Sequence, residues 1–243
     1  MSRLRRFVFA SDVHGDEQDP KAVSVFFDFV KHWKPEIRVH GGDAFDFRYL
    51  RRGALPAEER EDVKSDFDMG IDFIKRLKPT HFLRGNHDER LWDRLNDDDG
   101  KVRDYAIRVA DDICCALGSE CQMLPYDKRA GVLRIGKLKM IHGYSSGVYA
   151  ARLAAQVYGA VLLGHSHTID AYSSPSLEQH TAYICGCLCK LDMQYNRAQL
   201  QTLRQAHGWA YGIIAPSGLY QVWQARNLDG EWYFPTEVVR IGA

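Results

Sequence analysis

The feature that constrains this chain most is a short apolar run that ends in a glycine-rich polar turn, repeated five times. The five runs cover residues 6–10, 37–40, 80–83, 138–141 and 160–163. Histidine, aspartate or asparagine follows within a few residues of each run. Short apolar runs bounded by glycine turns are typical of strands. The pattern therefore predicts a sheet with polar side chains gathered at the ends of its strands.

Amphipathic helical patterns separate these runs. Residues 20–34 and 63–77 carry apolar side chains with a period near 3.6, and residues 148–158 are rich in alanine. Strands that alternate with helices predict an α/β domain. The active site of such a domain lies beyond the carboxyl ends of its strands, which is where the polar turns fall here.

The chain becomes β-like after residue 167. We expect strands over residues 181–191, 219–226 and 231–241, and residues 227–230 have the composition of a hairpin turn. The stretch 207–212 is rich in aromatic residues and glycine. We interpret this stretch as a packed turn, with a loop on the substrate side as the alternative.

A length of 243 residues fits a single domain over residues 1–243. Within it, the charged segment 48–62 and the segment 95–130, which begins with an acidic turn, are interpreted as inserts or lids. A helix is expected over residues 102–117 of the second segment.

The charge balance favours no charged polymer as a partner. Lysine plus arginine and aspartate plus glutamate number 32 each, so the formal net charge is zero. Such a balance gives no overall attraction to nucleic acid or to an anionic membrane. No apolar stretch reaches 18 residues, and the apolar run at residues 7–10 is too short for a signal peptide. We expect a cytoplasmic protein with reduced thiols and no membrane partner.

The cysteines include three that alternate with other residues. Cys185, Cys187 and Cys189 would point to one face if this segment formed a strand. No CxxC pair is present among the six cysteines, which disfavours a structural zinc knuckle. We interpret the three as small buried residues, with redox or metal chemistry as the alternative.

The polar turns supply a set of metal-binding side chains. The candidate ligands are Asp12, His14, Asp43, Asn86, His142, His165 and His167. Carboxylate, amide oxygen and imidazole are the ligands of hard to borderline divalent ions. Three oxygen and four nitrogen donors are too many for one tetrahedral zinc site. The set suits two ions about 4 Å apart that share a carboxylate, an arrangement that can hold a phosphoryl group and acidify water.

His87 and Asp46 are the candidate catalytic residues. His87 follows the candidate ligand Asn86 and can donate a proton to a leaving oxygen. Asp46 stands three residues after Asp43 and can orient the imidazole of His87.

The motifs together resemble those of calcineurin-like metallophosphoesterases. They read Asp12-x-His14, Gly42-Asp43-x-x-Asp46, Gly85-Asn86-His87-Asp88, His142-Gly143 and Gly164-His165-Ser166-His167. The resemblance implies an α/β fold of four layers, α/β/β/α, in which two mixed sheets are flanked by helices. It implies that His87 matches the catalytic histidine of the family.

The resemblance also implies how two divalent metal ions are held. One ion would be bound by Asp12, His14, Asp43 and His167, and the other by Asp43, Asn86, His142 and His165. Asp43 would be shared. Manganese is the first expectation for the ions, with iron, zinc or nickel as alternatives.

The sequence departs from the motifs of some branches of this superfamily, and these departures indicate which branches it resembles less. Protein serine/threonine phosphatases carry Gly-Asp-x-x-Asp-Arg-Gly, whereas Asp46 is followed here by Phe47-Arg48-Tyr49. Hydrolases of the lipid A pathway carry arginine where His87 stands, so that branch is disfavoured. Nucleases of the superfamily usually add a capping domain, which a chain of this length is too short to hold in full. The overall pattern is similar to that of small bacterial and phage metallophosphoesterases.

Four residues beside the motifs are candidates for contact with substrate. Arg48 and Arg90 can offer a bidentate fork to phosphate, with a solvated charged loop as the alternative. Tyr144 follows His142-Gly143 and can line the pocket, with simple packing as the alternative. Asn86 is counted both as a metal ligand and as a substrate contact.

The sequence thus predicts a metal-dependent hydrolase of phosphomonoesters or phosphodiesters. One alternative is a nuclease or cyclic-nucleotide phosphodiesterase, with nucleic acid as substrate only. A second alternative is a scaffold that binds metal without catalysis. The oligomeric state and the natural substrate do not follow from the sequence, because substrate choice depends on loops rather than on the fold.

Overall fold

The computed structural model describes residues 3–51, 53, 63–178, 180–191 and 200–234 of the chain. Most of the segment 48–62 and most of the expected strand 231–241 lie outside these residues. Among the described residues, no helix combines the length and the apolar character needed to cross a membrane.

The larger of two sheets has seven strands in the order β12-β11-β10-β1-β2-β3-β4. Its parallel half consists of β1 (Arg5–Ala10), β2 (Ile37–His40), β3 (His81–Leu83) and β4 (Gln122–Leu124). Its antiparallel half consists of β10 (Gly208–Ile214), β11 (Tyr220–Leu228) and β12 (Glu231–Trp232). The carboxyl ends of the parallel strands form one edge, where the first polar turns lie.

The smaller sheet has five strands in the order β5-β6-β7-β9-β8. The strands are β5 (Leu133–Ile135), β6 (Leu138–Ile141), β7 (Val161–Leu163), β8 (Ile169–Ser173) and β9 (Thr181–Cys185). Strands β6, β7 and β9 are parallel, and β5 and β8 pair antiparallel with β6 and β9. The turns after β6 and β7 therefore also share one edge.

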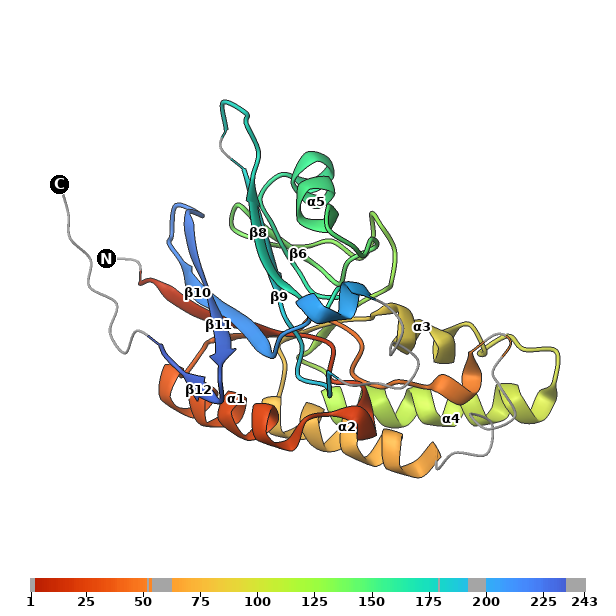
Figure 1. The fold of residues 1–243 in the computed structure, drawn as a ribbon. Coiled ribbons are helices and arrows are strands. Elements are labelled where there is room, and N and C mark those ends of the chain that lie inside the picture. The colour runs from red at the N-terminus through yellow and green to blue at the C-terminus, as the bar shows by residue number, and fades with distance from the viewer. Residues whose placement is uncertain (1–2, 52, 54–62, 179, 192–199, 235–243) are drawn as a thin grey trace.

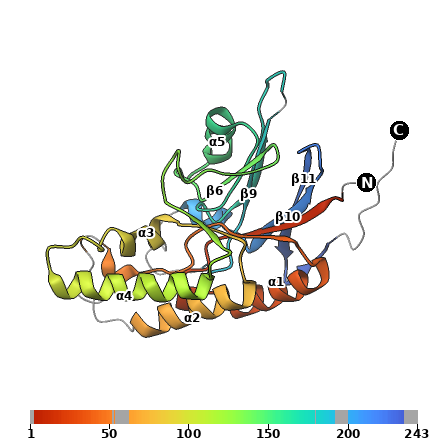
Figure 2. The ribbon, with the colours of Figure 1, turned by 180° about the vertical axis from the view of Figure 1, so that it is seen from behind.

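Helices cover the outer faces of both sheets (Figures 1 and 2). The long helices α1 (Pro20–Trp33), α2 (Val63–Leu77) and α4 (Gly100–Leu117) run along the larger sheet, and α5 (Ala150–Tyr158) lies over the smaller one. The short helix α3 (Asn86–Trp92) follows β3. Among the described residues, 3-10 helices are η1 (Gly15–Glu17), η2 (Arg48–Leu50) and η5 (Leu200–Arg204). The predicted four-layer α/β/β/α arrangement of two mixed sheets is confirmed.

Strand β1 shows how the layers are joined. Phe7 and Phe9 belong to the apolar cluster between the two sheets, together with residues of the smaller sheet such as Met140 and Leu162. The alternate residue Val8 packs instead in the cluster beneath α1. Because side chains of a strand alternate between its faces, one apolar run serves both interfaces.

Helix α1 begins and ends at local signals. The side chain of Asp19 accepts a hydrogen bond from the amide of Ala22 at 2.8 Å, and Pro20 occupies the first helical position. The helix ends at Lys34, which adopts a left-handed backbone with φ of 50°. These signals place the helix so that its buried side chains face the larger sheet.

The interpretation of residues 207–212 as a turn is wrong, because residues 208–212 belong to β10, an interior strand of the larger sheet. Trp209 and Tyr211 pack beneath α1, and Ala210 between them belongs to the cluster between the two sheets. A Cβ on Gly212 would lie 1.9 Å from the carbonyl oxygen of Gln221, so the close approach of β11 requires glycine here.

The expected strand 181–191 ends earlier, at Cys185. Gly186 has φ of +82°, a conformation that interrupts the strand. The three thiols therefore do not share one face, because Cys185 lies in the cluster between the sheets while Cys187 and Cys189 form a separate cluster.

The segment 95–130, expected to be an insert or lid, contributes regular elements to the layers. Helix α4 begins at Gly100, two residues before the expected start, because the side chain of Asp99 caps it by accepting from the amide of Lys101. Strand β4 then pairs with β3 at the edge of the larger sheet.

Candidate metal centre

The structure brings all seven candidate ligand residues to one place between the facing edges of the two sheets. The loop after β1 carries Asp12 and His14, the loop after β2 carries Asp43, and Asn86 opens α3 after β3. His142 follows β6 and the pair of histidines follows β7 in the smaller sheet. Each sheet therefore contributes part of the donor set.

Five of these seven residues have a left-handed backbone. The φ angles are 58° for Asp12, 54° for His14, 53° for Asp43, 68° for His165 and 56° for His167. A non-glycine residue in this conformation costs about 1–2 kcal/mol. Such a cost persists where the surrounding structure fixes the backbone, and it is typical of functional sites. Here the unusual backbone turns successive side chains toward a common centre.

The first cluster joins the loop after β1 to the loop after β7. Nε2 of His167 lies 3.4 Å from Oδ1 of Asp12 and 3.2 Å from Nε2 of His14. Nε2 of His14 is 3.8 Å from Oδ2 of Asp43. These four residues are the ones that the resemblance to metallophosphoesterases implies for one ion.

The second cluster is centred on Nε2 of His142. This nitrogen lies 3.3 Å from Oδ2 of Asp43, 3.1 Å from Oδ1 of Asn86 and 3.3 Å from Nδ1 of His165. Oδ2 of Asp43 is thus the atom at which the two clusters meet.

The electrostatics of the donor set fit a cation. Burial alone would raise the pKa of Asp12 and Asp43, but His167 beside Asp12 and His142 beside Asp43 hold the pKa of both carboxyls below the usual range. Burial alone would lower the pKa of His142, yet Asp43 raises it to about 9. Burial alone would also lower the pKa of His167, but the neighbouring Cys187 and Asp12 raise it above the usual value. Two buried carboxylates therefore draw positive charge into the centre.

An unsatisfied acceptor leads to the same conclusion. Oδ1 of Asp12 is buried and has no hydrogen-bond partner among the described residues. A buried carboxylate oxygen without a partner costs several kcal/mol unless a cation compensates it. The residues present therefore fit divalent ions, and the fit rests on the buried oxygen and the donor types.

Two carboxylates from helices hold the loop that carries Asp43 and Asp46. Asp88 of α3 accepts hydrogen bonds from the amides of residues 43, 44 and 45 at 2.8–3.2 Å and from the amide of Gly85 at 2.8 Å. Asp66 of α2 accepts from the amides of residues 46 and 47, both at 2.8 Å. Five consecutive amides are therefore bound by side chains, which fixes the position of both functional carboxylates.

Sequence reasoning assigned no role to Asp66. Its signal in the sequence is an acidic residue on the apolar face of an amphipathic helix, since it is 2% exposed in the first turn of α2. A charge in such a position is rarely buried unless it is paired or hydrogen-bonded.

His87 and Asp46 form the pair that the sequence predicted. Nδ1 of His87 lies 2.5 Å from Oδ1 of Asp46. Burial alone would raise the pKa of Asp46, but the hydrogen bond and charge of His87 hold it below the usual range. An ionised Asp46 accepts the proton of Nδ1, and the His87 side chain lines the cleft described below.

The two candidate arginines are held by protein groups. Arg90 donates to the carbonyl oxygen of Asp46 at 2.8 Å and lies 3.3 Å from Nε2 of His87. Arg48 forms ion pairs with Asp16 at 2.5 Å and with Asp46 at 3.1 Å. Both guanidinium groups therefore brace the Asp46 loop, and the structure does not place either side chain in the wall of the cleft.

Tyr144 also lies outside the wall of the cleft. Its hydroxyl donates to the carbonyl oxygen of Asp127 at 2.6 Å, and its ring packs against that of Tyr126. Tyr126 in turn contacts the ring of His142 edge-on. The structure gives Tyr144 a packing role behind the second cluster, which was the alternative drawn from the sequence.

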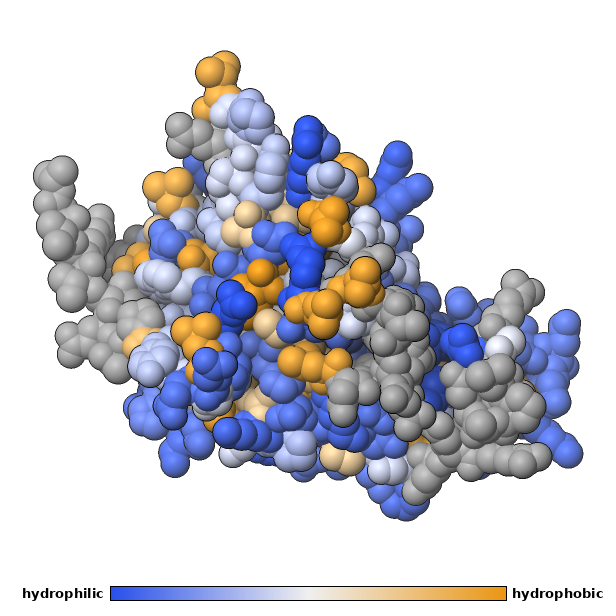
Figure 3. Space-filling view, viewed as in Figure 1, coloured by the Kyte–Doolittle hydropathy of each residue, from blue (hydrophilic) through white to orange (hydrophobic). Residues whose placement is uncertain are grey.

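A cleft opens over the two clusters. Its wall includes His14, Asp43, Asn86, His87, His165 and His167, and beside them Ser146, Gly147, Ser166, Thr168, Thr202, Arg204 and Gln205. Sequence reasoning missed Thr202, Arg204 and Gln205, because η5 is brought to the cleft by contacts distant in sequence. The bridge between Thr168 and Gln205 attaches η5 beside the histidine turn. On the face of the molecule drawn in Figure 3, hydrophilic residues cover most of the surface and hydrophobic residues form small separate groups.

Comparison with known proteins gives one family match. Residues 5–169 match the model of a family described as calcineurin-like phosphoesterase. This span includes all seven candidate ligands, His87 and Asp46.

Individual relatives are more distant. A UDP-2,3-diacylglucosamine hydrolase of Coxiella burnetii is 29% identical over 96 residues, which cover 38% of this chain and 36% of the relative. The chain thus matches about a third of the length of that curated relative.

Among solved structures, a D62A mutant of Vps29 from Entamoeba histolytica is similar with a TM-score of 0.50 and 12% identity, over 94% of this chain and 96% of the other. A metallophosphoesterase from Sphaerobacter thermophilus has a TM-score of 0.47 and 16% identity, over 93% and 89% of the two chains. At 12% identity, the likeness to the Vps29 structure concerns the fold alone.

Proposed function

Because the chain belongs to the calcineurin-like phosphoesterase family, we propose that it hydrolyses phosphomonoesters or phosphodiesters with two divalent metal ions. The observation that carries this proposal is the position of Asp43. Its Oδ2 atom lies 3.3 Å from Nε2 of His142 and 3.8 Å from Nε2 of His14, so one carboxylate serves both clusters. Ions bound there would supply Lewis acids that polarise the phosphoryl group and acidify water. Manganese is the first ion to test.

In the proposed division of ligands, each cluster holds one ion. The first is held by Asp12, His14, Asp43 and His167, and the second by Asp43, Asn86, His142 and His165. Every one of these groups offers an oxygen or an imidazole nitrogen, which suits manganese, iron, zinc or nickel. Asn86 also lines the cleft and would contact the bound phosphate.

His87 is proposed as the proton donor to the leaving oxygen. Asp46 fixes the imidazole by accepting from Nδ1, so Nε2 is the atom that would carry the transferred proton. Arg90 lies against the same nitrogen at 3.3 Å. An anionic substrate would attract the guanidinium of Arg90 away from His87. Nε2 of His87 would then be free to hold the proton.

The cleft wall beyond the clusters would contact the leaving group. Ser166, Thr168 and Gln205 offer hydroxyl and amide groups there. Arg204 stands at the same wall with its guanidinium 3.0 Å from the carboxylate of Asp170. A leaving group with its own hydrogen-bonding groups fits this wall better than an alkyl chain.

The first test is hydrolysis of p-nitrophenyl phosphate and of its bis ester by the purified protein with added Mn²⁺. The panel should include cyclic nucleotides, oligonucleotides and UDP-2,3-diacylglucosamine, the substrate named for the Coxiella relatives. We expect metal-dependent turnover of at least one ester that is abolished by EDTA. A protein that binds two ions and turns over no phosphoester would overturn the proposal and favour a scaffold.

The His87→Ala variant separates proton donation from metal binding. We expect kcat to fall about 10²-fold or more while both ions remain bound, since His87 is not among the proposed ligands. The matched control is His180→Ala, because His180 pairs with Glu178 on the surface and lies outside the cleft. An unchanged kcat in His87→Ala would show that another group donates the proton.

A further inference from the structure

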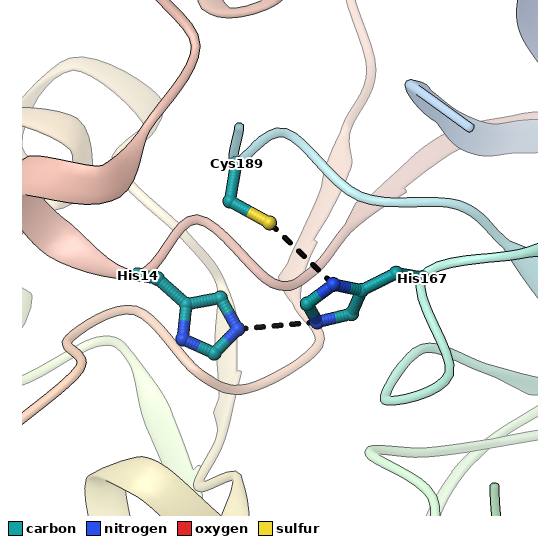
Figure 4. Close-up of side chains that lie close together, drawn as sticks. All are labelled: His14, His167 and Cys189. Atoms are coloured by element: carbon teal, nitrogen blue, oxygen red, sulfur yellow. Dashed lines mark hydrogen bonds between the residues drawn. The ribbon is translucent and has the colours of Figure 1, made fainter. Parts of the chain in front are cut away.

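Cys189 lies directly behind a proposed metal ligand. Its side chain is fully buried, and its Sγ atom is 3.6 Å from Nδ1 of His167 (Figure 4). On the other side of the same ring, Nε2 of His167 faces His14 at 3.2 Å. The imidazole of His167 therefore stands between the sulfur and the first cluster.

This arrangement distinguishes Cys189 from a metal ligand. The donor atoms of His14, His167 and Cys189 lie within 4.8 Å of one another, which by itself could describe a site for a thiophilic ion. Figure 4 shows instead a chain of contacts in which the sulfur meets one nitrogen of His167 and His14 meets the other. An ion bound by Nε2 of His167 would have the ring between itself and the sulfur.

The sulfur is held in place by the backbone around it. The amide of Leu188 donates to the carbonyl of Asp12 at 3.1 Å, and the amide of Lys190 donates to the carbonyl of Glu17 at 2.8 Å. The ring of His207 binds the carbonyl oxygen of Cys189 itself at 2.9 Å. The residues on either side of Cys189 are thus attached to the loop that carries the first two candidate ligands.

His14, the other histidine of the first cluster, has no such support among the described residues. Nδ1 of His14 is buried without a hydrogen-bond partner. In the second cluster, Nδ1 of His142 is 2.9 Å from the carbonyl oxygen of Gly41. A partner on the far nitrogen fixes the tautomer and the orientation of a ligating histidine, and its loss commonly costs 10–100-fold in metal affinity.

We propose that Cys189 is the positioning residue for His167, with its sulfur accepting the hydrogen of Nδ1 so that the lone pair of Nε2 points into the first cluster. This inference rests on the proposed two-ion centre. The two ion positions then differ in how a ligating histidine is held. The thiol of Cys189 contacts His167 at the first position, and the backbone carbonyl of Gly41 contacts His142 at the second. The affinity of the first position alone therefore depends on Cys189.

The test is equilibrium binding of Mn²⁺, followed by the electron paramagnetic resonance signal of the free ion. We expect Cys189→Ala to weaken one of two binding events about 10–100-fold and to leave the other unchanged. Cys189→Ser, which keeps an acceptor, should recover part of the loss. Cys185→Ala is the matched control, because Cys185 is also fully buried but lies between the sheets.

Two further readouts separate positioning from general damage. Thermal unfolding in EDTA should show Cys189→Ala and Cys185→Ala destabilised to a similar extent. Nitrogen-15 spectra of the histidine rings should show the Nδ1–H tautomer of His167 in the wild type with metal bound, and a loss of that preference in Cys189→Ala.

The outcomes distinguish this inference from the proposed function. Unchanged affinities at both positions in Cys189→Ala, with two ions bound by the wild type, would overturn the role of Cys189 and leave the hydrolase proposal standing. Weakening of both positions to the same degree would also overturn it, since the support would then not be specific. A wild-type protein that binds no Mn²⁺ would overturn both.

Discussion

At the scale of single residues, the donors could be predicted and their supports could not. Asp12, Asp43 and His167 could be recognised from the sequence, because metal-binding side chains there follow short apolar runs at glycine-rich turns. Asp66 binds the amide of Asp46 and Cys189 contacts His167, through contacts 20 and 22 residues distant in sequence. No local spacing encodes such contacts, so only the structure reveals them.

Asp46 provides a residue-scale prediction. Its carboxylate receives His87 on one oxygen and Arg48 on the other, at 2.5 and 3.1 Å. In Asp46→Asn the neutral amide holds His87 less firmly, so we expect kcat to fall about 10–100-fold with metal content unchanged. The comparison variant is Asp16→Asn, which removes another partner of Arg48 but leaves His87 in place. Equal kcat values for the two variants would argue against an orienting role for Asp46.

At the scale of elements, helices α2 and α3 act as clamps on the loop after β2. Asp66 and Asp88 together bind the amides of residues 43 to 47. The amphipathic period of residues 63–77 predicted the helix α2 correctly. The position of β10 was missed because its glycines were interpreted as turn residues, whereas they permit close packing of strands.

The pH dependence of stability tests the buried environment of Asp66, the α2 residue that binds the amides of residues 46 and 47. Burial raises the pKa of Asp66 from 3.8 to about 6. Between these values the unfolded chain has released a proton that the folded protein keeps. The contribution of Asp66 to stability is therefore full below pH 3.8 and is lost as pH rises through 6.

Asp66→Asn cannot ionise and should lack this dependence. Relative to the variant, the free energy of unfolding of the wild type should fall by roughly 1–3 kcal/mol between pH 4 and 6 and stay level at higher pH. Urea denaturation at several pH values measures the difference. Asp72→Asn on the exposed face of α2 is the control. A difference that rises with pH would contradict the stated environment of Asp66.

A glycine in α2 gives a second prediction at this scale. Alanine normally stabilises a helix interior by about 1 kcal/mol relative to glycine. A Cβ on Gly70, however, would lie 2.4 Å from ring atoms of Phe45, next to the clamped loop. We expect Gly70→Ala to lower the free energy of unfolding by about 1–3 kcal/mol. Lys75→Ala on the exposed side of the same helix should be neutral, and a stabilised Gly70→Ala would show that α2 does not pack this closely.

At the scale of the whole molecule, the candidate centre links the two sheets. The first cluster combines residues that follow β1 and β2 in the larger sheet with His167 after β7 in the smaller one. The alternation of strand and helix patterns predicted the α/β class, and the resemblance of the motif turns to those of metallophosphoesterases implied the four layers. The position of η5 at the cleft could not be predicted, because its contacts join residues more than thirty positions apart.

Metal removal should therefore lower the stability of the whole domain. A ligand that binds only the folded state adds about 2.7 kcal/mol at a concentration of 100 times its dissociation constant. We expect the thermal midpoint to fall on addition of EDTA and to return with excess Mn²⁺. Scanning calorimetry measures both changes, and a midpoint indifferent to EDTA and Mn²⁺ would mean that the cation does not bridge the sheets.

The central claim is that two ions share Asp43, and the most direct test is the number of Mn²⁺ ions bound per chain at equilibrium. The account predicts two ions for the wild type and the weakening of both in Asp43→Ala. It predicts the weakening of only one in Asn86→Ala, since Asn86 belongs to the second cluster. A wild-type stoichiometry of one, or an Asp43→Ala variant that loses a single ion and keeps the other at full affinity, would contradict it.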